Sequence, residues 1–503
     1  MLIGAMLSRR TLLETVAGSP AAATLRTAPA DQDSERFVGI TVMPEYIQSE
    51  GIDRVLDNLV NRAGATAVAT SPYVMAPADE KSGSREPPID AGAGKVRLLD
   101  RPLWGKRELF VRTAPSYTPD LRLYQGLRYR PAPPADLTRK EGAVIGDFLR
   151  AARSRHLKVY LQIQAAIPPG YRVQFGGPSE DDRPRLPDGR LPARGVANNA
   201  SLASLHVRRY TEALIRDLCQ AYPEIDGIRV DWPEYPPYLL DDVFLDFSAP
   251  AQAAAARLGF SWEQMRRDAA AIYAHLHGGL TEAEVSRWAG PDSGPYVLAQ
   301  ALVHRPGIVQ LMGFKAALVE ELLAGFRNAL TQAGGGSKQL MPNAFPPPFS
   351  LVSGMDFSLA ARHSAAISVK LYTMHWPMIV RFYGDALLKA NPSVPERLLV
   401  KALVGWLDIA DGPGFDRLAE YRYPEPETPH PAGLEAQARK IRQAQAHAGA
   451  TPVYALAHGY GPVEDFRNRL EAVYRAAGGR VWINRYGYLS DGKLEAIRQV
   501  CRR

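Results

Sequence analysis

The chain has 503 residues, of which 46% are hydrophobic and 22% charged, and these proportions exclude a disordered or fibrous protein. Its formal net charge is only +7 at pH 7 and it has no long Lys/Arg run, so we expect no nucleic-acid partner. Two cysteines, Cys219 and Cys501, are too few for a stabilising disulfide framework.

The first 30 residues are predicted to be an export signal. Arg9 and Arg10 lie in SRRTLL, ahead of a weakly apolar and Ala-rich stretch with possible cleavage regions at 21–23 and 28–30. This order is similar to a twin-arginine signal, and a disordered cytosolic tail is the alternative. No apolar run is long enough for a membrane span. We therefore expect a periplasmic or secreted protein whose residues 31–503 form a single folded domain.

Eight apolar runs of strand length follow one another along the chain, with amphipathic helical segments between them. The predicted strands span 36–43, 65–74, 157–166, 225–232, 338–344, 366–375, 452–459 and 479–486. The predicted helices include 51–64, 141–156, 205–222, 314–334 and 463–478, with 490–500 after the last strand. This alternation predicts a (β/α)8 TIM barrel. A doubly wound open sheet is the alternative, but the first strand is followed by MPEYIQSE rather than by a glycine-rich phosphate-binding turn.

Three long insertions are expected in the loops after strands 2, 3 and 4. They comprise residues 76–139, the segment that contains 176–199, and about 60 residues that begin at Phe247. All three leave the carboxyl ends of strands, where the loops of such barrels build the active site. Their length predicts a deep cleft with several subsites.

The fourth strand, IDGIRVDW, carries two charges on one face. Because side chains alternate along a strand, Arg229 and Asp231 face the barrel interior while Val230 and Trp232 face outward. Burial of two charged groups costs several kcal/mol unless they are paired or solvated, so we expect them at the open carboxyl end. The sequence WPEYPP then ends the strand, since proline cannot continue a hydrogen-bonded ladder.

The same alternation predicts a ring of polar side chains at the mouth of the barrel. Its members are Gln162, Gln164, Ser368, Lys370, Tyr372, Asn484, Tyr486 and, by extension of the first strand, Glu45. Aromatic neighbours accompany the ring, namely Tyr46, Tyr73, Trp232 and Trp376. His375 and Asn199 are further candidate contacts to sugar hydroxyls, and the Trp376 ring is a candidate stacking platform. Such a mixture is typical of a carbohydrate-binding site, although each residue taken alone could equally be a packed core or turn residue.

At this point the sequence resembles a known group of proteins. The run VANNASLASLHVRRYTEALIRDLCQAYPEIDGIRVDWPEYPPY, residues 196–238, resembles a stretch of glycoside-hydrolase-like barrel families, and DGIRVD is similar to the fourth-strand motif of the α-amylase superfamily. The segments 367–384 and 482–498 also look typical of these barrels. The fifth strand departs from the amylase pattern, because KQLMPNAFPPP offers no glutamate as the general acid.

The resemblance implies that Asp231 is the nucleophile, or the carboxylate that stabilises the transition state, and that Arg229 keeps it ionised. Glycoside hydrolysis needs a second carboxyl group, for which Glu234 is the first candidate and Glu45 the second. Turn or loop glutamates without a catalytic role are the alternative for both. Asp356 is a third candidate and a candidate substrate contact, or else the N-cap of the helix that begins FSLAAR.

We expect no metal and no cofactor, because the ten histidines lack metal-ligand spacing and no P-loop occurs. A G-x-S-x-G nucleophile elbow is also missing from the sequence. The sequence therefore predicts a glycoside hydrolase that acts on a poly- or oligosaccharide by carboxylate acid/base chemistry. Two alternatives stay open: a catalytically silent carbohydrate-binding barrel, and an aldolase or lyase that uses Lys370 as a Schiff base.

Overall fold

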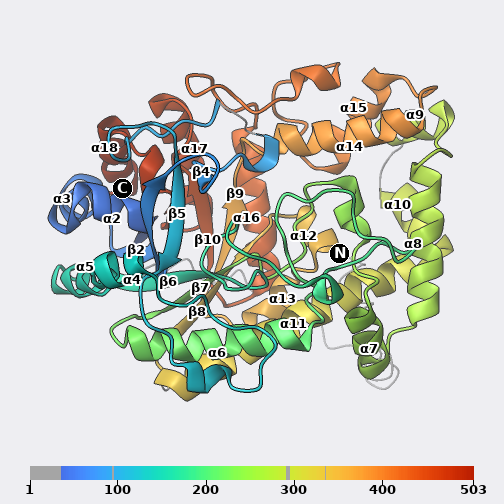
Figure 1. Cartoon of the computed structure of the whole chain (residues 1–503). Coiled ribbons are helices and arrows are strands. Elements are labelled where there is room, and N and C mark those ends of the chain that lie inside the picture. The colour runs from blue at the N-terminus through green and yellow to red at the C-terminus, as the bar shows by residue number, and fades with distance from the viewer. Residues whose placement is uncertain (1–35, 93–95, 291–294, 335, 503) are drawn as a thin grey trace, which may run out of the picture. The chain divides into compact units, whose positions relative to one another are not determined.

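The computed structural model describes residues 36–92, 96–290, 295–334 and 336–502, so the predicted signal at 1–30 lies outside the described residues. Eight parallel strands form a closed barrel in the order β1-β2-β6-β7-β8-β9-β10-β11 (Figure 1). They are β1 (Phe37–Thr41), β2 (Ala67–Thr70), β6 (Lys158–Gln164), β7 (Gly227–Asp231), β8 (Gln339–Ala344), β9 (Ile367–Leu371), β10 (Val453–His458) and β11 (Arg480–Asn484). The predicted (β/α)8 barrel and its eight strands are confirmed, each strand being somewhat shorter than expected.

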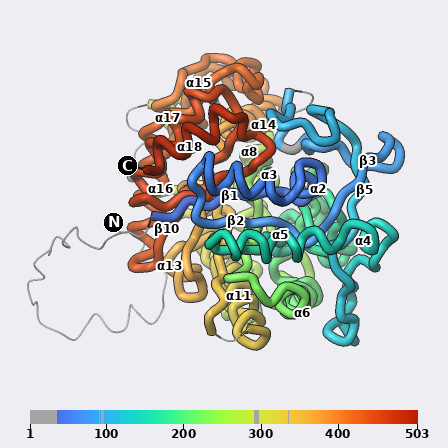
Figure 2. Tube along the Cα trace, turned by 90° about the vertical axis from the view of Figure 1, so that its left-hand side faces the viewer, coloured from blue at the N-terminus to red at the C-terminus, as the bar shows by residue number. Residues whose placement is uncertain are grey.

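Helices surround the barrel and bury one apolar stripe each. They are α3 (Ile52–Asp57), α5 (Ala143–Ser154), α6 (Leu205–Ala221), α11 (Pro306–Gly334), α13 (Phe357–Ala361), α16 (Leu434–Ala448), α17 (Val463–Ala476) and α18 (Asp491–Cys501). Helix α6 packs beside α11, and α17 packs beside α18, as Figure 2 shows. In α6, for example, Val207, Leu214 and Leu218 are buried, while the outward-facing Ile228 and Val230 of β7 are fully buried behind these helices. Among the described helices, none is both long and apolar enough to cross a membrane.

The inside of the barrel is filled by side chains from alternate strand positions. Phe37, Tyr160, Met341 and Trp482 belong to one buried apolar cluster there. The Trp482 ring occupies the space beside Gly39, where an added Cβ would lie 2.3 Å from it. The Trp482 ring is thus the apolar floor beneath the mouth of the barrel.

The segment after β2 forms a separate antiparallel sheet. Its strands are β3 (Tyr73–Ala78), β4 (Ser84–Glu86) and β5 (Leu109–Pro115), in the order β3-β5-β4. The strand predicted over 65–74 is therefore two strands in two different sheets. The break falls at Ser71 and Pro72, because proline has no N–H to donate to the barrel ladder.

Two helices follow β9 before a Pro-rich connection, where the sequence shows a helical stretch. Helices α14 (Trp376–Ala390) and α15 (Glu396–Trp406) precede α16, and α14 begins close after the carboxyl end of β9. Helix α14 packs against the 3-10 helix η6 (Leu240–Phe244) of the segment after β7, and α15 packs against α9 (Glu282–Ala289) (Figure 1). Segments after β7 and β9 therefore meet beyond the barrel. The segment after β7 also carries α7 (Ala249–Leu258), α8 (Trp262–Leu276) and α10 (Pro295–His304).

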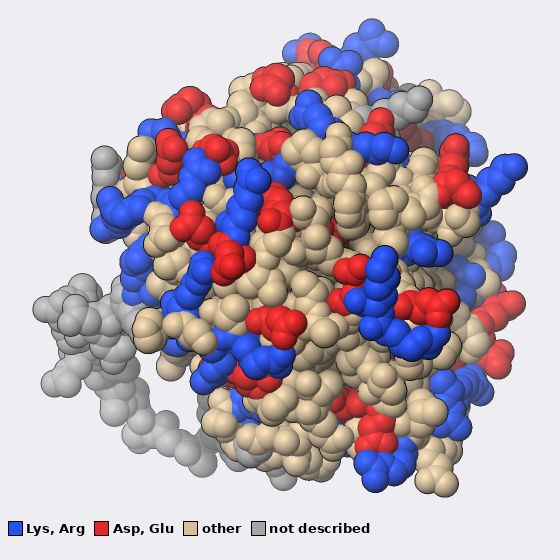
Figure 3. Space-filling model, turned by 60° about the vertical axis from the view of Figure 1, so that its left-hand side comes forward, with Lys and Arg blue, Asp and Glu red and all other residues tan. Residues whose placement is uncertain are grey.

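The charged side chains on the face seen in Figure 3 are mixed in sign. Lys and Arg side chains lie among Asp and Glu side chains there. Among the exposed ion pairs of the molecule, Arg397 lies 3.1 Å from Asp416. The formal charge of +7 is thus offset locally by acidic neighbours on this face.

Close approach of β7 and β8 predicts that Gly227→Ala lowers the free energy of unfolding by about 1–3 kcal/mol. An added Cβ would lie 2.2 Å from the backbone oxygen of Gln339, which cannot move without disturbing the barrel. Gly405→Ala in α15 is the control, since a Cβ there meets nothing within 4 Å and alanine favours a helix. Urea denaturation compares the two variants, and a Gly227→Ala protein as stable as wild type would contradict the close approach.

Candidate active site

A buried ion pair joins β7 to β9 at the mouth of the barrel. The Lys370 Nζ atom lies 2.9 Å from Asp231 Oδ1, and the two side chains are 2% and 9% exposed. Asn343 of β8, the strand between them, donates to the same Asp231 oxygen at 3.4 Å. The Lys370 ammonium also lies 4.6 Å from the Phe345 ring centroid and 5.4 Å from that of Trp232. A buried lysine is tolerated here because a carboxylate and two aromatic faces surround it.

Arg229 lies deeper in the barrel and donates hydrogen bonds to side chains of other barrel strands. Its guanidinium donates to Thr41 Oγ1 and Gln162 Oε1, both at 3.0 Å, and to Asn343 Oδ1 at 2.9 Å. It also stacks on the Trp482 ring, with its central carbon 3.9 Å from the ring centroid. Burial lowers the pKa of Arg229 to about 10, so the guanidinium stays charged at neutral pH.

The structure corrects the prediction that Arg229 is the ion-pair partner of Asp231. The sequence predicted that Arg229 holds the carboxylate ionised, but within the described residues the cation at ion-pair distance from Asp231 is Lys370. Arg229 is two residues deeper in the same strand. Its guanidinium nitrogens donate hydrogen bonds to side chains of β1, β6 and β8. Asn343 bonds both residues, and the Asp231 charge also acts directly on Arg229, whose pKa it raises against the effect of burial.

Glu234 is fully buried in the turn after β7. Its Oε1 accepts a hydrogen bond from the Phe345 N–H at 2.6 Å, and its Oε2 accepts one from the Ser353 hydroxyl at 2.5 Å. Burial raises the pKa of Glu234 to about 7, and the nearby Lys370 charge opposes that rise. At neutral pH this carboxyl group therefore holds a proton for an appreciable part of the time.

Glu45 lies in a second charged cluster beside the mouth. It lies in the first turn of α2 (Pro44–Glu50), and its Oε2 accepts a hydrogen bond from Tyr73 at 3.3 Å, while its buried Oε1 has no hydrogen-bond partner. Glu86 of β4 accepts from Arg172 at 3.1 Å and is paired with Arg485. Burial, followed by the charge of Glu86, raises the pKa of Glu45 to about 7.

Aromatic and imidazole side chains close over Lys370. A cavity of about 10 Å³ is lined by Tyr238, Phe345, Tyr372, His375 and Trp376, among others. The Tyr372 hydroxyl accepts from Asn484 Nδ2 at 2.6 Å, and Nδ1 of His375 lies 2.9 Å from the Tyr238 hydroxyl. Burial lowers the pKa of His375 well below its usual range, so its imidazole is neutral. A space of this volume holds about one water molecule.

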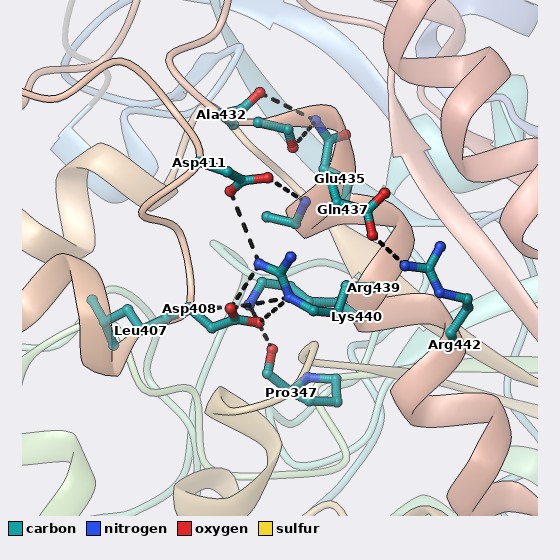
Figure 4. A network of polar contacts seen from close by, with 12 residues as sticks. Pro347, Leu407, Asp408, Asp411, Ala432, Glu435, Gln437, Arg439, Lys440 and Arg442 are labelled. Carbon is teal, nitrogen blue, oxygen red and sulfur yellow. Dashed lines mark hydrogen bonds and ion pairs between the residues drawn. The ribbon is translucent and has the colours of Figure 1, made fainter. Parts of the chain in front are cut away.

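A buried network steadies the segment that carries Phe345. Lys440 of α16 donates to the Pro347 carbonyl at 2.9 Å and to the Leu407 carbonyl at 3.2 Å, and it lies 3.4 Å from Asp408 Oδ2 (Figure 4). The Lys440 ammonium is also 5.4 Å from the Trp376 ring centroid. This network ties α16 to two sides of the small cavity. Lys440 was not anticipated, because a lysine in an amphipathic helix is normally a solvent-facing residue.

Three other predicted site residues have clear structural surroundings. Asn199 donates to the Glu234 carbonyl at 3.4 Å, and its buried Oδ1 has no partner. Asp356 caps α13, accepting from the backbone N–H groups of Ser358 and Leu359, which is the alternative role expected for it. The prediction that Tyr486 faces the mouth is wrong. Its hydroxyl is hydrogen-bonded to Glu50 and Asn58, which belong to the helical segment after β1. Strand alternation ends at Asn484, and Tyr486 begins a 3-10 helix.

No group of three or more His, Cys, Asp or Glu residues in the described part of the chain is arranged to hold a metal ion. No family model matches the sequence, and no curated protein is similar to it. The chain is similar to several solved structures of low identity. One is a β-galactosidase from the psychrophilic Marinomonas ef1, with 12% identity and a TM-score of 0.48, over 92% of this chain and 59% of that one.

Two further similarities cover nearly the whole of both chains. The catalytic domain of a β-amylase from Paenibacillus polymyxa has 9% identity and a TM-score of 0.46, over 92% of this chain and 97% of that one. A chitinase from Chromobacterium violaceum has 9% identity and a TM-score of 0.39, over 93% of this chain and 99% of that one. At such identities the similarity concerns the fold alone.

The ion pair predicts that Lys370→Met destabilises the protein by about 3–5 kcal/mol, because it leaves the Asp231 carboxylate buried without a cation. Arg397→Met is the control, since Arg397 and Asp416 are 80% and 67% exposed and such pairs contribute at most about 1 kcal/mol. Asp231→Asn added to Lys370→Met should recover part of the loss. Equal urea midpoints for Lys370→Met and Arg397→Met would contradict the buried pair.

Proposed function

We propose that the protein is a glycoside hydrolase that acts on a poly- or oligosaccharide. The observation that carries the proposal is the difference between two carboxyl groups three residues apart, one at the end of β7 and one in the turn after it. Asp231 is paired with an ammonium, whereas Glu234 is fully buried with a pKa raised to about 7 by burial. Two carboxyl groups whose environments separate their protonation states are what glycosidic bond cleavage requires.

In the proposed reaction the ionised Asp231 acts on the anomeric carbon, as nucleophile or as the charge that stabilises an oxocarbenium-like transition state. Glu234 donates the proton to the leaving oxygen. Glu45, which also has a pKa raised to about 7 and an oxygen without a partner, is the second candidate for the proton donor. Tyr372, His375 and the rings of Trp232 and Trp376 would hold the sugar by hydroxyl bonds and stacking.

Substrate access needs movement of the aromatic side chains around Lys370. The cavity there has a volume of about 10 Å³, and Glu234 is completely buried. A sugar ring can therefore reach Asp231 only after Tyr238, Phe345 or Trp376 is displaced. We also infer that residues 1–30 direct export by the twin-arginine route, an inference supported by the order of SRRTLL and the Ala-rich stretch after it.

The Schiff-base alternative is disfavoured by the ion pair of Lys370. A lysine nucleophile must present its nitrogen to a carbonyl carbon, and the Lys370 nitrogen is held 2.9 Å from Asp231 Oδ1. Borohydride reduction with a carbonyl substrate, followed by mass measurement, would trap an adduct on Lys370 if that alternative held.

A screen of aryl glycosides and polysaccharides tests the proposal. Asp231→Asn and Glu234→Gln should each lower kcat by about 10² to 10⁴, the usual contribution of a positioned acid or base. Asp416→Asn, a change in an exposed surface pair, should leave turnover unchanged. Full turnover by Asp231→Asn would overturn the assignment. Saccharide binding without hydrolysis, unaffected by Asp231→Asn, would instead identify a silent carbohydrate-binding barrel.

A further inference from the structure

A second cavity, larger than the one around Lys370, lies on the other side of the turn that follows β7. It has a volume of about 330 Å³ and is formed between the segment after β6 and the segment after β7. Residues 232–238, here called the partition segment, separate it from the small cavity. Tyr235 and Pro236 of the partition segment line the large cavity, whereas Tyr238 lines the small one.

Two arginines line the large cavity without an acidic partner. Among the described residues, no hydrogen bond or ion pair joins the guanidinium of Arg183 or of Arg194 to a carboxylate, and Arg194 stacks on the Phe382 ring at 5.0 Å. The acids of the same loop have other partners: Asp182 is 3.0 Å from Arg128, Glu180 is 3.4 Å from Arg185, and Asp188 is 2.6 Å from Arg190. These acids of the loop therefore do not neutralise the two guanidinium groups.

The only acidic residue among those lining the large cavity, Asp242, offsets little of the positive charge of Arg183 and Arg194. Asp242 accepts a hydrogen bond from the Leu239 N–H at 2.9 Å. Burial raises its pKa to about 7, so its negative charge is only partial at neutral pH. The cavity is thus positive overall, a condition that favours an anionic ligand.

A buried amide adds a second polar contact in the same cavity. Asn199 is 7% exposed, and its Oδ1 has no hydrogen-bond partner. Its Nδ2 is already bonded to the Glu234 carbonyl at 3.4 Å, which fixes the amide against the partition segment. A buried acceptor without a donor is costly, so a ligand that supplies a hydroxyl group is favoured here.

We propose that this cavity binds an anionic sugar unit of the substrate, with its carboxylate or sulfate group on Arg183 and Arg194 and a hydroxyl group on Asn199 Oδ1. The inference rests on the proposed function, because it extends the same saccharide across the partition segment from Asp231. It narrows the substrate class to acidic saccharides. The carboxylate of a uronic acid and the sulfate ester of a sulfated sugar share the chemistry that the two guanidinium groups recognise.

Calorimetric titration of the full protein with three trisaccharides tests the inference. The probes are a uronic-acid trisaccharide, a sulfated trisaccharide and a neutral trisaccharide, and the first two distinguish the two sources of negative charge. At least one acidic probe should bind about tenfold or more tightly than the neutral one. Arg183→Gln with Arg194→Gln should abolish this preference, and the corresponding double lysine variant should retain part of it. Arg397→Gln, an exposed arginine of another surface, is the control.

Equal binding of acidic and neutral probes by the wild type would overturn the inference, and so would an acidic preference that survives the double glutamine variant. Failure of all three probes to bind would overturn it as well. Hydrolysis of neutral aryl glycosides, measured in parallel, tests the proposed hydrolase function separately from the acidic-sugar site. If that hydrolysis persists while the acidic preference is missing, only the inference fails. Thermal unfolding of each variant ensures that lost binding is not lost folding.

Discussion

The ion pair between Lys370 and Asp231 is the constraint on which the arrangement of the mouth depends. Both side chains are almost fully buried, and neither charge could be placed there alone at an acceptable cost. The pair spans β8, which is hydrogen-bonded to both β7 and β9, and Asn343 of β8 donates to Asp231 between them. Arg229 then continues the polar contacts inward to Thr41 and Gln162, above the Trp482 ring.

The same interaction sets the chemistry around it. The Lys370 ammonium opposes the effect of burial on Glu234, while the charge of Asp231 adds to that effect. The partition segment carries Glu234 and divides the space beyond the barrel into a small aromatic cavity and a large positive one. The Lys440 network holds one side of the small cavity through the Pro347 carbonyl (Figure 4). A movement of the partition segment would therefore alter both cavities together.

Sequence periodicity predicted the part of this arrangement that depends on one strand at a time. Alternation placed Arg229 and Asp231 on one face of β7 and Lys370 on the inner face of β9, because the period of two is fixed by the backbone. Trp482 shares the alternation of Asn484 and could have been assigned to the interior in the same way.

The pairing of these residues could not be predicted, since it depends on the register of strands far apart in the chain. Whether Asp231 pairs with Arg229 or with Lys370 depends on the position of each side chain along the barrel axis, which the strand register sets. Glu86 comes from an inserted sheet, and Lys440 comes from a helix whose apolar stripe gave no sign of a buried charge. Tyr486 was misplaced because it lies two residues after the end of β11, where the alternation rule no longer holds.

The pH dependence of kcat/KM for a hydrolysed glycoside tests most directly whether Asp231 and Glu234 work in opposite protonation states. Our account predicts that kcat/KM falls as the pH rises through about 7, because Glu234 loses the proton that the leaving oxygen needs and its pKa is raised to about 7 by burial. A value of kcat/KM that stays level from below pH 7 to well above it would contradict that division of roles.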